Sequence, residues 1–211
     1  MNTSNKGIVI SCFDYSGNIV LPWADAGYKC YCVDFRHGYG ERREGNITYV
    51  GANLHYEWLP PDTNIAFAAF SPPFFPVEDG VSRFRNENVG VLVEAIQLFY
   101  TSVCLAELSL APYLIECPAP EFSRYWREPD RTLIPSDYTG YIGGGYEHYE
   151  RKSYLWFGGG FIMPEPKPLG PCGGSKMFNI PTSPYTPHGF AQAVFEANRP
   201  DREDGAHEVP V

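Results

Sequence analysis

The chain has 211 residues and a formal net charge of −9, with 14 Phe, 15 Tyr and 4 Trp. Its length fits a single domain, and this aromatic content excludes a disordered chain. The negative charge argues against binding nucleic acid or an anionic membrane by bulk charge, and no run approaches 18 consecutive apolar residues. Because the six cysteines lack the density of a disulfide framework, we expect reduced thiols, a cytoplasmic location and no membrane partner.

The first half of the chain alternates between strand-like and helix-like segments. Apolar, β-rich runs predict strands over 7–13, 29–35, 46–50, 64–70 and 113–116, with helices over 18–26 and 88–110. This alternation indicates an α/β fold with a doubly wound, mostly parallel sheet.

The second half has a different composition. Residues 118–186 are rich in Pro, Gly and Tyr, and they predict loops around one strand-like run at 154–157. An amphipathic helix is expected over 187–198, and the acidic residues 199–211 predict a flexible tail. We therefore predict a single domain over 1–198 with a loop-rich C-terminal part.

Polar residues follow the predicted strands at the edge where an open parallel sheet binds ligands. They are Asp14-Tyr15-Ser16-Gly17, Asp34, Asn53, Ser71-Pro72-Pro73-Phe74 and Glu116. A glycine after the first strand lets the backbone approach a ligand, and an acid after the second can accept both hydroxyls of a ribose. Each feature alone is more often ordinary loop chemistry, but their order favours a cofactor that contains a nucleoside.

The sequence lacks the usual signals for binding phosphates or metals. No G-x-G-x-x-G follows the first strand, and no G-x-x-x-x-G-K-[ST] occurs in the chain. A nucleoside cofactor without phosphates points to S-adenosylmethionine (SAM). The five histidines are scattered and no Cys-x-x-Cys pair occurs, so we predict no metal site.

The sequence resembles small phage proteins related to SAM-dependent DNA (cytosine) methyltransferases in five runs, at 13–38, 71–84, 113–130, 151–166 and 186–198. The first run reads FDYSGNIVLPWADAGYKCYCVDFRHG and the second reads SPPFFPVEDGVSRF. The resemblance implies the Rossmann-like fold of SAM-dependent methyltransferases. It also makes the loop-rich part, 118–186, the candidate for a reduced target-recognition region.

The resemblance implies roles for residues at the first three strand ends. Phe13, Asp14 and Gly17 would shape the methionine side of a SAM pocket, and Asp34 would bind the ribose. Asn53 lies where the family usually has an Asp facing the adenine amino group, so the charge is lost there. The expected partner is DNA, single- or double-stranded, or a cytosine nucleotide, and a homodimer is left open.

The sequence departs from the family at Phe74. The family's Pro-Pro-Cys motif supplies the cysteine that attacks the pyrimidine ring and activates carbon 5, whereas this chain has Pro72-Pro73-Phe74. A phenylalanine cannot be a nucleophile. Glu116 is retained where the family holds the flipped cytosine, but Cys117 replaces the Asn that follows it.

Three hypotheses for the chemistry follow from this departure. Ser-Pro-Pro-Phe is also a motif of enzymes that methylate the exocyclic amino nitrogen of cytosine. In that case Ser71 and the Pro72 carbonyl would accept the amino hydrogens, and Phe74 would stack on the extruded base. In the second hypothesis, Cys117 replaces the lost thiol. In the third, methyl transfer is abandoned and the protein binds SAM, nucleic acid or a host protein.

Overall fold

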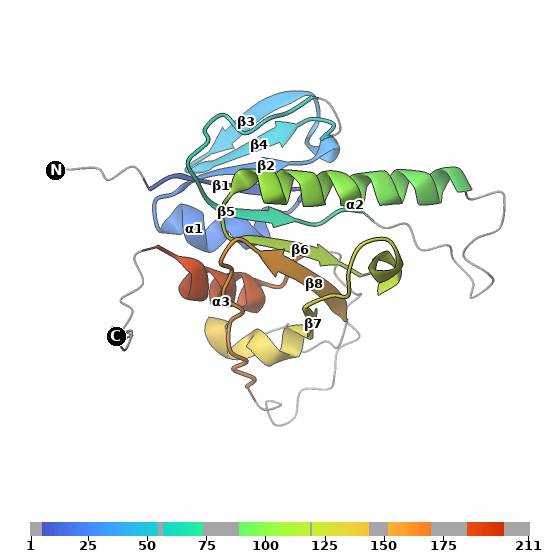
Figure 1. Cartoon of the computed structure of the whole chain (residues 1–211). Helices are drawn as coiled ribbons and strands as arrows, with labels where there is room; N and C mark the ends of the chain where they lie inside the picture. Colours follow the sequence, from blue (N-terminus) through green and yellow to red (C-terminus); the bar gives the residue numbers. More distant parts are fainter. Residues whose placement is uncertain are drawn as a thin grey trace, which may run out of the picture.

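A computed structural model describes residues 6–54, 57–73, 89–118, 120–143, 152–169 and 185–200. Their strands form one eight-stranded sheet in the order β3-β4-β2-β1-β5-β6-β8-β7 (Figure 1). The predicted α/β class, with a sheet that is mostly parallel in its middle, is confirmed. Most of the predicted tail at 199–211 lies outside the described residues.

Five parallel strands form the middle of the sheet. In sheet order they are β4 (Ile47–Gly51), β2 (Lys29–Val33), β1 (Ile8–Cys12), β5 (Ile65–Phe70) and β6 (Tyr113–Cys117). Every residue of β1 is buried, because a central parallel strand is covered on both faces. Each of the five strands lies within two residues of the run that predicts it.

Antiparallel strands complete both ends of the sheet. β3 (Gly40–Glu44) pairs with β4, while β8 (Ser153–Gly158) pairs with β6 and with β7 (Arg131–Leu133). β8 contains the predicted run, whereas β3 and β7 are not predicted. The sequence of β3 is GERRE, so apolar and polar residues do not alternate along it as they do in a half-buried strand. All of its residues are exposed, and its charged side chains suit the edge of a sheet. β7 is only three residues long.

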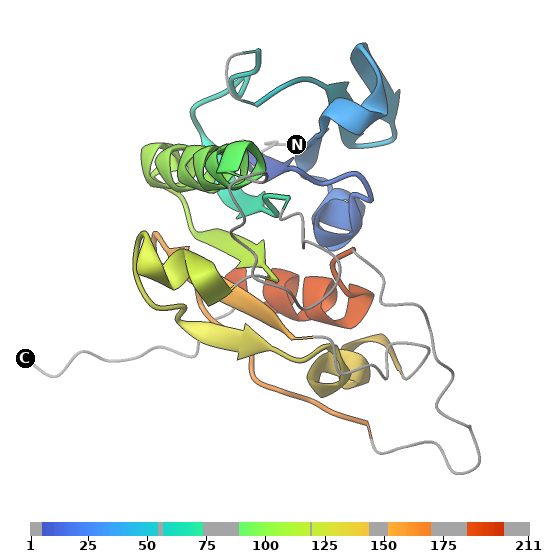
Figure 2. The same ribbon diagram turned by 90° about the vertical axis from the view of Figure 1, so that its right-hand side faces the viewer.

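Helices cover both faces of the sheet (Figures 1 and 2). α2 (Val89–Ser109) packs against β5 and β6 on one face, and α1 (Leu21–Asp25) packs with α3 (His188–Asn198) on the other. Each face of the sheet has its own hydrophobic core, and successive side chains of β1 point to opposite faces. Val9 packs in the core beside α1 and α3, whereas Ile8 and Ile10 pack in the core beneath α2. The short 3-10 helices are η1 (Asn18–Val20), η2 (Phe35–His37), η4 (Pro120–Arg124) and η5 (Pro135–Ile142).

The strand order reverses next to β1. After β1 the chain adds β2 and β4 on one side, and then it returns to add β5 and β6 on the other. Open α/β sheets bind ligands at such a reversal, outside the carboxyl ends of the strands. In this chain the reversal places the residues after β1 and those after β5 side by side, and the backbone N–H of Ser71 donates to the Cys12 carbonyl at 3.0 Å.

Among the described residues, α2 is the helix long and apolar enough to cross a membrane, with a mean hydropathy of 1.7 over an 18-residue window. A helix that packs against a sheet passes the same test, so length and composition are weak evidence for a span. The inner side of α2 packs into the core through Ala95, Phe99 and Ala106. Only 33% of that window is buried inside the protein, so the expectation of a chain without a membrane segment stays a prediction.

Gly51 ends β4 against the backbone of Gly38, the residue that follows η2. A Cβ at position 51 would fall on the Gly38 carbonyl oxygen. Gly51→Ala should therefore force the two segments apart and lower the free energy of unfolding by about 2 kcal/mol, as overpacking does. Urea denaturation measures this loss. Gly90→Ala is the control, because its Cβ meets open space in α2, and an equal loss in both variants would contradict the steric explanation.

Candidate functional site

A cavity of about 270 Å³ lies at the carboxyl ends of β1, β2, β5 and β6. Six residues singled out from the sequence line it: Phe13, Asp14, Asp34, Ser71, Pro72 and Glu116. The rest of the lining is Tyr15, Phe35, Arg36, Pro73, Pro118, Tyr185 and Thr186. This volume is close to the lower end for small-molecule sites, which is about 300 Å³. The position at the strand-order reversal is the one where α/β sheets bind ligands.

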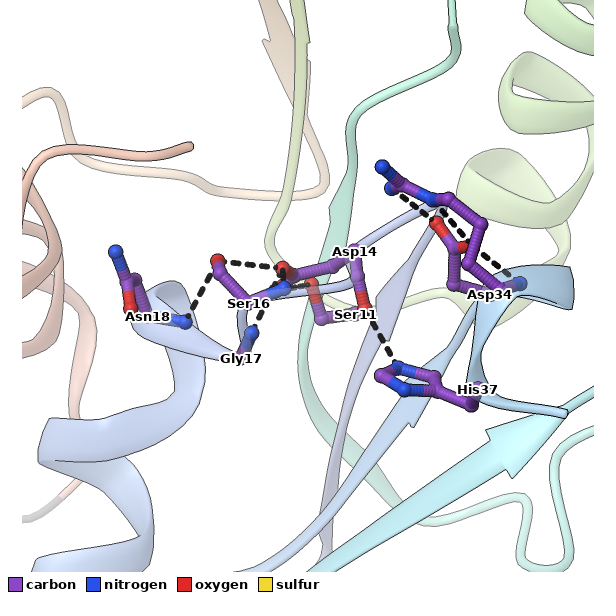
Figure 3. A network of polar contacts seen from close by, with 8 residues as sticks. Ser11, Asp14, Ser16, Gly17, Asn18, Asp34 and His37 are labelled. Atoms are coloured by element: carbon purple, nitrogen blue, oxygen red, sulfur yellow. Dashed lines mark hydrogen bonds and ion pairs between the residues drawn. The ribbon is translucent and has the colours of Figure 1, made fainter. Parts of the chain in front are cut away.

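Asp14 organises the loop that follows β1 (Figure 3). One carboxylate oxygen accepts from the Ser11 hydroxyl at 2.8 Å. The other accepts from the Ser16 and Gly17 backbone N–H groups, at 2.9 and 2.8 Å, and from the Ser16 hydroxyl at 2.9 Å. Asp14 is only 6% exposed, so these four bonds hold a charge that would be costly to bury alone. Its carboxylate therefore shapes the cavity wall through the loop.

Two backbone features explain the shape of this loop. Gly17 has φ of +73°, and a Cβ there would lie 3.2 Å from the Tyr49 hydroxyl and 3.3 Å from the Cys32 sulfur. Gly17 does not line the cavity, so the glycine serves a tight turn and not the close approach of a ligand that we expected. Phe13 has φ of +59°, a strained conformation for this residue type, and it lines the cavity. Such strain is typical of ligand sites.

Asp34 follows β2, and Arg36 binds its buried carboxylate. One oxygen accepts from the Arg36 backbone N–H and from Nε, both at 2.8 Å, and the other accepts from Nη2 at 2.6 Å. These bonds raise the pKa of the Arg36 guanidinium above its usual value. The residue expected to bind a ribose thus already has a charged partner from its own chain. The Arg36 side chain is 45% exposed, whereas the Asp34 side chain that it binds is only 4% exposed.

An aromatic group covers the β1 and β2 side of the cavity. The Tyr15 ring stacks on His37 with centroids 5.1 Å apart, and the Arg36 guanidinium lies 4.9 Å from the Tyr15 ring. A ring nitrogen of His37 lies 3.1 Å from the Asp14 carbonyl oxygen (Figure 3). These contacts connect the ends of the first two parallel strands. They also place the partly exposed Tyr15 ring at the cavity, with His37 and Arg36 already packed against it.

The opposite side of the cavity brings together residues distant in sequence. Glu116 of β6 accepts from the Thr186 hydroxyl at 3.3 Å, and the Thr186 carbonyl accepts from the Asn18 side chain at 3.0 Å. Tyr185 and Thr186 precede α3, and sequence reasoning missed both as site residues. Seventy residues separate Glu116 from Thr186, so no local pattern could have indicated the pair.

Two other predicted site residues, Cys117 and Asn53, do not line the cavity. Cys117 is fully buried in the core cluster beneath α2, because it points to the sheet face opposite to that of Glu116. Asn53 does not line the cavity, and its backbone N–H donates to the Glu57 carboxylate at 2.7 Å. Phe74 lies outside the described residues, so its predicted stacking role stays a prediction.

The buried cysteines of β1 and β2 are held as neutral thiols. Burial, with the nearby Asp14 charge as a second cause, raises the pKa of Cys12 far above its usual value. Burial likewise raises the pKa of Cys30 to about 12 and that of Cys32 well above the usual range. A thiolate is the reactive form, so none of the three is an activated nucleophile at neutral pH. Within the described part of the chain, no three His, Cys, Asp or Glu side chains are placed to hold a metal ion.

The fold and the cavity together define an α/β protein with a ligand-sized site at a strand-order reversal. Comparisons of the chain with protein-family models, curated proteins and solved structures give no match. Its function is therefore argued from the geometry of the cavity and from the sequence motifs that line it.

Proposed function

We propose that this protein is a SAM-dependent methyltransferase that acts on the exocyclic amino group of cytosine, in DNA or in a cytosine nucleotide. One observation carries the proposal. The cavity is lined by residues that the resemblance assigns to the cofactor, Phe13, Asp14 and Asp34. It is also lined by two residues expected to bind the base, Glu116 from the resemblance and Ser71 from the Ser-Pro-Pro-Phe motif. These residues come from four different strand ends, so their convergence is not a consequence of sequence proximity.

The cofactor side of the cavity fits a nucleoside. A carboxylate offers about four acceptor positions, and Arg36 occupies three of those on Asp34, so at least one stays available for a ribose hydroxyl. Phe13 and Phe35 add apolar lining to the same cavity, as an adenine or a thioether would need. When bound, SAM supplies an electrophilic methyl group. In the proposal Phe13 and Asp34 hold and orient that cofactor.

The base side of the cavity supports amino transfer and gives no support to carbon-5 transfer. Ser71 lines the cavity next to Pro72, where its hydroxyl and the proline carbonyl can accept hydrogens from a cytosine amino group. Accepting these hydrogens would orient the nitrogen lone pair for attack on a methyl group. The sulfur–methyl bond of the cofactor would break as the nitrogen–carbon bond forms, S-adenosylhomocysteine would leave, and the amino proton would be lost to solvent. Glu116 would bind the ring edge of the base. Carbon-5 transfer needs a thiolate, and no described cysteine lines the cavity.

A second candidate function is binding without turnover. Two observations favour it: Arg36 makes a bidentate ion pair with the proposed ribose-binding carboxylate, and Asn53 does not line the cavity. Both would lower the affinity for SAM relative to an open site. A protein that used the cavity only to hold a base would not need Asp34 to contact a ribose or Asn53 to contact an adenine.

DNA that contains 5-fluorocytosine distinguishes the two methyl-transfer routes. Carbon-5 transfer adds a protein thiolate to the ring and leaves a trapped covalent adduct, whereas direct attack by the amino nitrogen leaves none. We expect no adduct from the wild type with SAM present, as judged by denaturing gel electrophoresis and mass spectrometry. A SAM-dependent adduct that disappears in Cys117→Ser would contradict the proposal and make Cys117 the nucleophile.

A further inference from the structure

Thr186 joins two segments around the cavity, and the proposed function gives it no role. It lies just before α3 and lines the cavity, although it is only 8% exposed. Its hydroxyl donates to Oε2 of Glu116 at 3.3 Å, and its backbone carbonyl accepts from Nδ2 of Asn18 at 3.0 Å. Thr186 therefore connects the carboxyl end of β6 with the loop that follows β1.

The alternation of side chains along β6 brings Glu116 to Thr186. Leu114 packs in the core beside α1 and α3, whereas Ile115 and Cys117 pack in the core beneath α2. Glu116 therefore projects from the same face of the sheet as Leu114, which is the face that α3 covers. Because the chain enters α3 on this face, the Thr186 hydroxyl meets the carboxylate there.

The backbone of Thr186 is itself held in place. Asn18 donates to its carbonyl, and the Asn18 backbone N–H donates to the Ser16 hydroxyl at 3.2 Å (Figure 3). The Ser16 hydroxyl in turn donates to the Asp14 carboxylate at 2.9 Å. Pro187 follows with a φ of −62°, and a residue before proline is biased toward extended conformations. Thr186 therefore presents its hydroxyl from a fixed backbone.

A fixed donor affects binding because a glutamate side chain is flexible. Its rotatable bonds lose conformational freedom when it binds a ligand, and a hydrogen bond made beforehand lowers that cost. We propose that Thr186 is a positioning residue, which orients the Glu116 carboxylate toward the ring edge of cytosine. The inference rests on the proposed function, in which Glu116 binds that edge.

Two substitutions separate the hydroxyl of Thr186 from its shape. Thr186→Val keeps the volume and the backbone carbonyl but removes the donor, whereas Thr186→Ser keeps the donor. The probes are single-stranded DNA that contains cytosine and deoxycytidine monophosphate, with affinities measured by isothermal titration calorimetry. Thr186→Val should weaken the binding of whichever probe the wild type binds by about fivefold, the contribution of one ordinary hydrogen bond. Thr186→Ser should bind that probe like the wild type.

Binding of SAM separates positioning from a general effect on the fold. The affinity for SAM should be the same in Thr186→Val as in the wild type, and the KM for the base substrate should rise while the KM for SAM does not. Thr139→Val is the matched control, because Thr139 is buried in η5, away from the cavity lining, and its hydroxyl donates to the Ser136 carbonyl at 3.1 Å. This control should lower the melting temperature without changing either affinity.

Nuclear magnetic resonance tests the contact without any ligand. The carbon-13 signal of the Glu116 carboxyl, identified by its loss in Glu116→Gln, should shift in Thr186→Val and stay near its wild-type position in Thr186→Ser. An unchanged signal in Thr186→Val would overturn the proposal, whatever the protein binds.

The binding results distinguish this role from the proposed function. A wild type that binds SAM but neither cytosine probe would overturn the proposed function, and the role of Thr186 with it. A wild type that binds a probe no more tightly than Thr186→Val does would overturn the role of Thr186 alone, as would a Thr186→Ser as weak as Thr186→Val. Equal losses of SAM and probe affinity in Thr186→Val would also overturn it and assign the residue to the fold.

Discussion

Asp14→Ala should lower the free energy of unfolding by about 3 kcal/mol or more. The substitution removes the acceptor of four hydrogen bonds in a nearly buried loop, and it leaves the Ser16 and Gly17 backbone N–H groups without their partner. Hydrogen bonds to a charged group each contribute about 1.5–3 kcal/mol, and an unsatisfied buried donor adds a penalty. Chemical denaturation monitored by tryptophan fluorescence measures the change.

Asp14→Asn is the matched control for this prediction. The amide oxygen can still accept from the Ser16 and Gly17 N–H groups, and the amide nitrogen can donate to the Ser11 hydroxyl in place of the lost acceptor. We expect this variant to lose about 1 kcal/mol, the contribution of one ordinary hydrogen bond. A loss below 1 kcal/mol in Asp14→Ala would mean that the loop after β1 does not depend on this carboxylate.

Asp34→Ala should weaken SAM binding by about 10- to 150-fold, which is the loss of about 1.5–3 kcal/mol from hydrogen bonds to a charged group. The proposal assigns the ribose hydroxyl to this carboxylate, which is buried at the cavity wall. Isothermal titration calorimetry with the wild type and the variant measures the ratio. A wild type without measurable SAM affinity would contradict both the cofactor and the enzymatic function.

Arg36→Ala separates ligand binding from the structural role of the ion pair. Arg36 donates three hydrogen bonds to Asp34, and its side-chain donors compete with a ribose for the same oxygens. Removing these donors should tighten SAM binding, by up to about tenfold for about 1.4 kcal/mol. If Arg36→Ala and Asp34→Ala instead weaken SAM equally and lower stability equally, Asp34 serves the fold and not the cofactor.

The middle of the sheet could be predicted because local patterns determine it. The runs that contain β1 and β5 are mostly apolar, and Ser71-Pro72-Pro73 stops further strand pairing. β3 could not be predicted, since GERRE forms a strand only by pairing with β4 at the sheet edge. Tertiary pairing decides such a segment, and no apolar period in the sequence marks it.

The candidate site could be predicted in outline for a similar reason. The carboxyl ends of parallel strands meet at one edge of the sheet, so Asp14, Asp34, Ser71 and Glu116 were expected to converge. The alternation of side chains along β6 also could have separated Glu116, at the cavity, from Cys117, in the core. The clamp by Arg36 is a local contact two residues from Asp34, but residue types alone do not decide that the guanidinium turns back onto this carboxylate. The approach of Thr186 to Glu116 depends on packing across the fold, for which the sequence carries no local signal.

The central claim is that this cavity supports methyl transfer to the amino group of cytosine. The most direct test incubates the protein with SAM that carries a labelled methyl group and with single-stranded DNA, duplex DNA or a cytosine nucleotide, followed by mass spectrometry of the nucleosides. The account predicts labelled, amino-methylated cytosine, with the product lost in Ser71→Ala and in Asp34→Ala. Labelled 5-methylcytosine, or no labelled base from any of these substrates, would contradict it.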